Sequence, residues 1–138
     1  MDAQRTAPAV GIVACLLVLV VALAPSVLVG EPPVGAYYAA GPTGLSAVGF
    51  LGVFGVVAFL AGRQGRTEPD VAAGVALMLG VTTLALAVVW FLAVDETLLF
   101  SFPAEYAWIE WHRLAVPLVA AVVPVAAGAY AWAVLARR

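Results

Sequence analysis

The chain has 138 residues, of which 65% are hydrophobic and 10% are charged. Average soluble domains are about half apolar and about a quarter charged, so a water-soluble protein of this length would expose more apolar surface than it could bury. The composition therefore indicates a protein whose solvent is partly lipid. A formal net charge of −2 without a basic run excludes the electrostatic footprint of a nucleic-acid-binding protein, and a single cysteine excludes an intrachain disulfide.

Ionisable residues and prolines divide the chain into four apolar stretches. A hydrocarbon core of about 30 Å needs about 20 helical residues, and unpaired backbone is not tolerated in lipid. We therefore predict an all-α integral membrane four-helix bundle, formed as a single transmembrane domain by residues 1–138. The predicted spans are residues 8–29, 44–61, 71–94 and 114–136.

The first span raises the question of a cleaved leader. Ala22-Leu23-Ala24 resembles a signal-peptidase site, but Pro25 follows it directly and the apolar run continues. Ile12-Val13-Ala14-Cys15 has the letters of a lipobox, but the residues that follow are apolar where a mature lipoprotein would be polar. We therefore expect an uncleaved span in which Cys15 is a buried, inert thiol.

Small residues in the next three spans predict where the helices touch, because helix association in lipid depends on close packing. The second span carries a row of glycines, the third a face of small residues, and the fourth two prolines seven residues apart. Each proline frees a backbone carbonyl, which either accompanies a bend of the helix or coordinates an ion; we expect the bend. The predicted packing residues are Gly49, Gly52, Gly55, Ala76, Gly80, Pro117 and Pro124.

The connection between the third and fourth spans, residues 95–113, is the most unusual segment. Ser101 is predicted to cap a short interfacial helix that has Pro103 in its first turn, runs through Trp111 and joins the fourth span. The aromatic residues of this segment suit the lipid headgroup layer, where they would form a collar that fixes helix depth. A ligand-binding cap is the alternative.

Ionisable residues in this connection form a candidate outer-face site or ion-pair cluster. Carboxylates and one histidine can hold a divalent metal, but their spacing matches no recognised metal site, so no metal is predicted. We expect Arg113 to pair with Asp95 or Glu96. We expect His112→Gln to have almost no effect on folding, assembly or growth. The cluster comprises Asp95, Glu96, Glu105, Glu110, His112 and Arg113.

The arginines predict the orientation of the bundle. With four spans, both termini and the loop at residues 62–70 share one side, and this side holds every arginine except Arg113. Short arginine-rich loops stay cytoplasmic, so we expect a multi-pass cell-membrane protein with both termini inside. The arginines of that side are Arg5, Arg63, Arg66, Arg137 and Arg138; Glu31 adds to the acidic outer side.

No span has an Asp, Glu, Lys, Arg or His in its apolar middle. Intramembrane ionisable groups are typical of proton-coupled transport, ion relays and voltage sensing, and a bis-histidine haem would need a second histidine. We therefore expect a non-enzymatic accessory or assembly subunit without a cofactor, whose partners are the lipid bilayer and either another membrane protein or further copies. The alternative is a small solute or ion carrier or channel with an outer aromatic-acidic cap.

Four short stretches carry a resemblance to a known family: Val34-Gly35-Ala36-Tyr37-Tyr38, Ala61-Gly62-Arg63 through Thr67-Glu68-Pro69, Ala72-Ala73-Gly74-Val75-Ala76, and Trp111-His112-Arg113. Together they resemble a family of small haloarchaeal membrane proteins of unknown function. The resemblance covers nearly the whole chain and implies four spans of about this length in an archaeal cell membrane. It implies no activity, because that family has none assigned.

Overall fold

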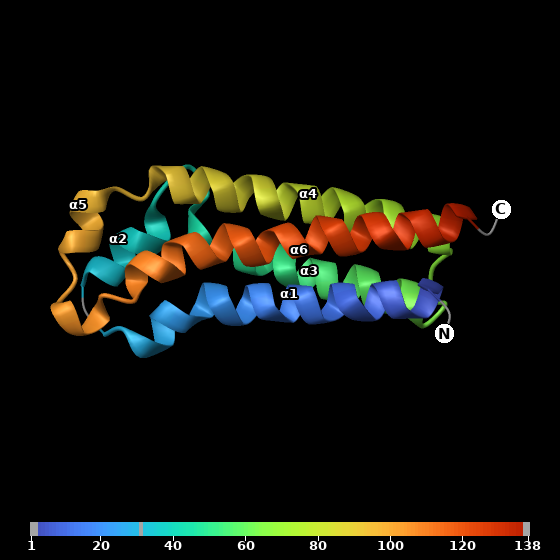
Figure 1. The fold of residues 1–138 in the computed structure, drawn as a ribbon, viewed down its shortest axis with the longest axis horizontal. Helices are drawn as coiled ribbons and strands as arrows, with labels where there is room; N and C mark the ends of the chain where they lie inside the picture. The colour runs from blue at the N-terminus through green and yellow to red at the C-terminus, as the bar shows by residue number, and fades with distance from the viewer. Residues whose placement is uncertain (1–2, 31, 137–138) are drawn as a thin grey trace.

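Four long helices make up most of the computed structural model, which describes residues 3–30 and 32–136. By length and composition, each of the four is able to cross a membrane. They alternate in direction along the chain (Figure 1). These helices are α1 (Ala3–Leu28), α3 (Gly44–Arg63), α4 (Pro69–Ala93) and α6 (Ile109–Ala136).

The four long helices close into a ring. Helix α1 packs against α3 and α6, and α4 packs against the same two helices, so each long helix has two antiparallel neighbours. This arrangement confirms the predicted all-α four-helix bundle.

Short helices gather at one end of the bundle, which we call the short-helix end (Figure 1). The opposite end, where α1 begins and α6 ends, is called the terminal end. Helix α2 lies between α1 and α3, whereas α5 and the 3-10 turn η1 lie between α4 and α6. Their bounds are α2 (Pro33–Ala39), α5 (Glu96–Phe100) and η1 (Ala104–Tyr106).

The connection before α6 differs from the single capped helix that the sequence predicts. Asp95, not Ser101, caps a helix here: its side chain accepts the Thr97 N–H at 3.1 Å. Ser101 ends α5 instead, and its hydroxyl donates to the Leu98 carbonyl. Helix α6 begins at Ile109, five residues before the predicted boundary at 114, because protein buries Ile109 and His112 on one side of its first turn, so that the helix need not stop where the hydrocarbon ends.

Glycines set the closest approaches between long helices. On α3, a Cβ at Gly52 would lie 3.3 Å from the Cys15 carbonyl, and one at Gly55 would collide with the buried Cys15 sulfur. On α4, a Cβ at Gly80 would lie 2.9 Å from the backbone of Pro124 on α6. The α1–α3 and α4–α6 pairs therefore approach closely at positions where only a hydrogen fits.

The remaining predicted packing residues lie near these contacts. Ala76 is fully buried on the face of α4 that includes Gly80, and Gly49 on α3 approaches the Ala22 methyl group of α1. Pro117 is half-buried on α6, about two turns from the Gly80 contact at Pro124. The small-residue faces are therefore used within the bundle and are not turned toward lipid.

Candidate functional site

Aromatic side chains fill the interior of the short-helix end around Tyr37. Its ring centroid lies 5.0 Å from that of Trp90, 6.0 Å from that of Phe102 and 5.7 Å from that of His112. All four residues are buried, and the first two pairs are edge-to-face, an arrangement worth about 0.5–1.5 kcal/mol per pair beyond area burial.

The position of Tyr37 follows from the local sequence of α2 and its turn. Pro33 lies in the first turn of α2, where a missing N–H costs nothing. After α2, the chain turns into α3 through Gly44, whose φ of +74° and contact with the Tyr38 carbonyl leave no room for a Cβ. This tight return folds α2 back over the ends of the long helices and brings Tyr37 inward.

His112 links α2, α6 and α1 through its two ring nitrogens. Its Nδ1 lies 2.7 Å from the Tyr37 hydroxyl, and its Nε2 contacts the Val21 carbonyl oxygen. A carbonyl only accepts, so Nε2 carries the proton, and in the neutral imidazole Nδ1 accepts from the Tyr37 hydroxyl. Burial raises the pKa of Tyr37 above its usual range, which keeps this phenol protonated as a donor.

Pro25 explains why the Val21 carbonyl is available to His112. Proline has no N–H, so the carbonyl four residues earlier in α1 lacks its usual helical donor. One residue further on, the Tyr38 hydroxyl donates to the Ala22 carbonyl and accepts the Ser26 N–H at 3.0 Å. Those two backbone groups are the ones that an uninterrupted helix would pair with each other.

The part of α1 at the short-helix end is therefore completed by side chains from α2 and α6. This site is not among those predicted from the sequence, although two signals for it are visible. Pro25 follows Val21 by four residues, and Tyr37 and Tyr38 stand between prolines in a segment otherwise made of small residues. Which side chain would reach the freed carbonyl depends on tertiary contacts that spacing along the chain does not encode.

Two further side chains of this end bind carbonyls in the last turns of helices. Trp90 Nε1 donates to the Tyr37 carbonyl at 2.9 Å. Arg113 donates through Nε and Nη2 to the Phe91 carbonyl at 3.1 and 3.0 Å, and its guanidinium lies 4.5 Å from the Phe91 ring centroid. Carbonyls in the last turn of a helix lack helical partners, and a cation there also meets the negative end of the helix dipole.

The structure thus gives Arg113 a different partner from the one expected. Within residues 3–30 and 32–136, its guanidinium forms no salt bridge with Asp95 or Glu96. Asp95 instead caps α5. The His112 imidazole makes one buried and one part-buried hydrogen bond, so from the structure we expect His112→Gln to lose stability rather than to be nearly silent.

The six residues of the predicted outer-face cluster are not brought into one site. Glu96, Glu110 and Arg113 line a cavity of about 290 Å³ between α5 and α6. Glu105 is exposed on η1, and His112 faces the interior of the bundle. Among the described residues, no group of three side chains is placed to hold a metal ion.

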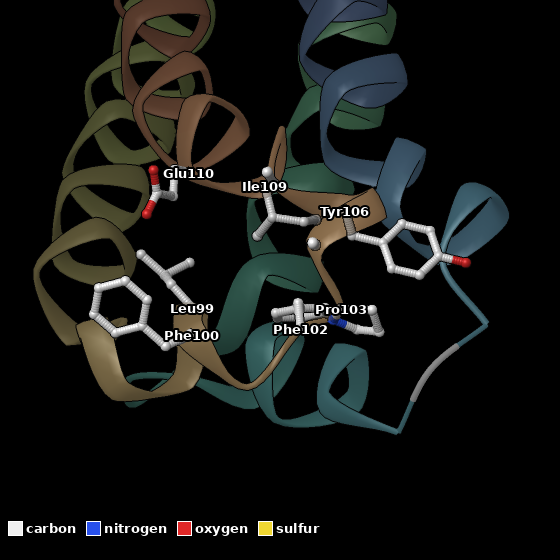
Figure 2. A pocket seen from close by; sticks show the side chains of 9 residues that line it. Leu99, Phe100, Phe102, Pro103, Tyr106, Ile109 and Glu110 are labelled. Carbon is white, nitrogen blue, oxygen red and sulfur yellow. The ribbon is translucent and has the colours of Figure 1, made fainter.

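A second cavity, of about 180 Å³, adjoins the first and shares Glu110 with it. Figure 2 shows Phe100 and Glu110 on one side of this cavity and Tyr106 on the other, with Ile109 between them. One carboxylate therefore stands at the boundary of two small, partly apolar hollows on the outside of the aromatic core.

The aromatic residues of the predicted interfacial collar differ in exposure. Phe102 is buried, Tyr106 and Trp108 are half-buried, and Phe100 and Trp111 are 76% and 74% exposed. The exposed pair is placed as a headgroup collar requires.

Three of the arginines used for the orientation argument, Arg5, Arg63 and Arg66, lie at the terminal end of the bundle, opposite Arg113. Glu31, Arg137 and Arg138 lie outside the described residues. The separation of arginines between the two ends is thus seen for the described part of the chain.

Comparison with known proteins gives one finding. A model of a family described as "Family of unknown function (DUF7548)" matches residues 1–135 of the chain. No curated protein and no solved structure matches it. The family match spans all four long helices.

Proposed function

Since the chain belongs to DUF7548, a family of unknown function, its role must be argued from its own residues, and we propose that it is a non-enzymatic four-span subunit that acts by assembling with other membrane helices. One observation carries this proposal. The buried polar side chains of the short-helix end are all engaged in holding helices together, and no buried side-chain nitrogen or oxygen of the described residues lacks a partner. A catalytic or transport site keeps such groups available for its substrate.

The outer faces of α4 and α6 support assembly as the mode of action. Gly74 on α4 and Gly128 on α6 are the two glycines of these helices where a Cβ would meet no atom within 4 Å. Met78, one turn from Gly74, is 73% exposed. Small residues on an outward face allow the backbone of another helix to approach closely, which is how membrane helices associate.

Photo-cross-linking in native membranes tests the proposal. A photoreactive residue at Met78 should give a discrete protein adduct, and Gly74→Leu should weaken it because the leucine side chain would hold the partner helix away. The matched control is Val13, which is 57% exposed on α1. Mass spectrometry of the adduct tells a second copy from another protein. If both positions yield only lipid adducts, the assembly proposal is wrong.

A small solute or ion carrier is the second candidate, favoured by the two cavities that meet at Glu110. If the outer end binds a cation for transport, proteoliposomes should show a sodium or potassium flux that Glu110→Gln abolishes. We expect no flux above that of empty vesicles, because no ionisable side chain continues the route through the middle of the bundle.

The orientation belongs to the same proposal: both termini in the cytoplasm, and the short-helix end outside a haloarchaeal cell membrane. The arginines at the terminal end and the carboxylates at the short-helix end support it, as does the family resemblance of the sequence. A cysteine at Ser101 should label in intact cells, and one at Gln64 only after permeabilisation. Cys15 is buried and should give no background. Labelling of the Gln64 position from outside would reverse the orientation.

A further inference from the structure

A cavity of about 290 Å³ opens at the terminal end of the bundle, away from the site described above. It brings together the start of α1, the turn between α3 and α4, and the last part of α6. The described residues of its lining include two guanidinium groups and no carboxylate; they are Arg5, Gly62, Arg63, Gln64, Gly65, Pro69 and Tyr130.

Arg5 and Arg63 meet at this cavity although they are 58 positions apart. Arg63 Nε donates to the Arg5 backbone carbonyl at 3.4 Å, and this hydrogen bond holds the Arg63 guanidinium beside Arg5. Within the described part of the chain, neither guanidinium forms an ion pair, and the Arg5 side chain makes no hydrogen bond. Glu68 and Asp70 flank Pro69 but do not line the cavity. Among the described residues, two positive charges are therefore placed together at the cavity without an ion-pair partner.

Tyr130 supplies an independent observation at the same place. Its side chain is 1% exposed, and its ring packs near Phe59 with centroids 6.5 Å apart. Tyr130 is one of the residues that line the cavity, and its hydroxyl has no hydrogen-bond partner among the described residues. A Cβ at Gly62 would collide with this hydroxyl, so the absence of a side chain at Gly62 leaves the Tyr130 hydroxyl open to the cavity.

We propose that this cavity binds a phosphate group, with Arg5, Arg63 and the Tyr130 hydroxyl as donors. Guanidinium groups match phosphate oxygens in geometry and charge, and a hydroxyl without a hydrogen-bond partner can donate to an anionic acceptor. The cavity lies where α3 ends and α4 begins, which is the depth of lipid headgroups. Basic pockets of this kind between membrane helices bind anionic phospholipids, and the phosphodiester of such a lipid would supply the phosphate group. Free inorganic phosphate has the same kind of oxygens and is the other source.

Native mass spectrometry of the full chain in a non-ionic detergent tests the proposal. Phosphatidylglycerol, phosphatidylcholine and inorganic phosphate are titrated separately, and the melting temperature is followed in parallel. Phosphatidylglycerol should bind and raise the melting temperature more than phosphatidylcholine. Tyr130→Phe and Arg63→Gln should each weaken binding by about tenfold, the equivalent of one lost charge-assisted hydrogen bond. Arg66→Gln is the matched control, because this arginine is at the same end but does not line the cavity.

Each outcome decides the proposal. Saturable binding of phosphatidylglycerol that depends on Tyr130 and Arg63 supports a lipid headgroup site. Equal, variant-sensitive binding of inorganic phosphate supports the same site with a soluble source. If Arg66→Gln weakens binding as much as Tyr130→Phe does, the binding depends only on the positive charge of this end, and the proposal is wrong. An absence of binding also overturns the proposal. Variants with unchanged melting temperatures in the lipid-free state exclude misfolding as the cause.

Discussion

The two ends of the bundle use tyrosine in opposite ways. Tyr37 at the short-helix end is buried, and its hydroxyl donates to an imidazole that in turn donates to a backbone carbonyl. Tyr130 at the terminal end is equally buried, but its hydroxyl faces a cavity and has no partner among the described residues. In the first case the polar group holds helices together; in the second it remains available to a ligand. The contrast teaches that burial of a polar side chain does not by itself reveal a structural role.

Trp90→Ala is the most damaging change that we expect at the short-helix end. It removes a fully buried ring that packs on Tyr37 and donates to the Tyr37 carbonyl, and it should lower the free energy of unfolding by about 3–5 kcal/mol. Titration with a denaturing detergent, followed by circular dichroism, measures this. The exposed Trp111 is the control, and Trp111→Ala should cost less than about 1 kcal/mol. Equal costs would mean that the aromatic interior is not the centre of stability.

Replacing each of the two tyrosines by phenylalanine tests the contrast between the two ends directly, and we expect the larger loss of stability at Tyr37. Tyr37→Phe leaves the His112 Nδ1 without its donor and should cost about 1–3 kcal/mol, and His112→Gln should fall in the same range. A double-mutant cycle between Tyr37→Phe and His112→Gln should show coupling, because both changes remove one interaction. Additive losses would show that the Tyr37–His112 hydrogen bond contributes little.

Arg113→Lys should cost about 1 kcal/mol, because lysine keeps the charge but not the pair of N–H groups that converge on the Phe91 carbonyl oxygen. Glu96→Gln is the matched test of the ion-pair interpretation and should change thermal stability hardly at all. If the Glu96 variant loses as much stability as the Arg113 variant, Arg113 acts through a carboxylate after all.

Tyr130→Phe should have the smallest effect, less than about 0.5 kcal/mol in lipid-free protein, because the hydroxyl that it removes forms no hydrogen bond within the described structure. The melting temperature in phosphate-free buffer is the measurement. A loss as large as that of Tyr37→Phe would show that the Tyr130 hydroxyl is used for folding, and the contrast between the two ends would disappear.

The four spans could be predicted because lipid forces uncharged stretches of this length to be helical. The contact of Gly80 with Pro124 shows that small-residue spacing also carries information on packing. The boundary of α6 could not be found in this way, because Ile109 and His112 are buried by protein rather than by lipid, and hydropathy does not distinguish the two kinds of burial.

The candidate site was less accessible to prediction than the fold. Ionisable residues drew attention to Arg113 and its neighbouring carboxylates, yet the guanidinium binds a carbonyl, a group that every residue possesses. Likewise, His112 reaches the carbonyl freed by Pro25 on a helix 91 positions away. Because every residue has a backbone carbonyl, the sequence does not show which carbonyl accepts a hydrogen bond from a side chain. Only the folded arrangement identifies such an acceptor.

The break at Pro25 also bears on the order in which the protein is made. Helix α1 is synthesised first, but the hydroxyl that reaches the Ala22 carbonyl comes 16 residues later and the imidazole that reaches the Val21 carbonyl comes 91 residues later. Until α6 has left the ribosome, the Val21 carbonyl, which lacks a helical donor because of Pro25, has no imidazole to pair with, and an unpaired carbonyl is costly to place in hydrocarbon. The part of newly inserted α1 around Val21 should therefore stay in contact with water or with the insertion machinery. We expect α1 to enter the bilayer completely only after α6 has been synthesised.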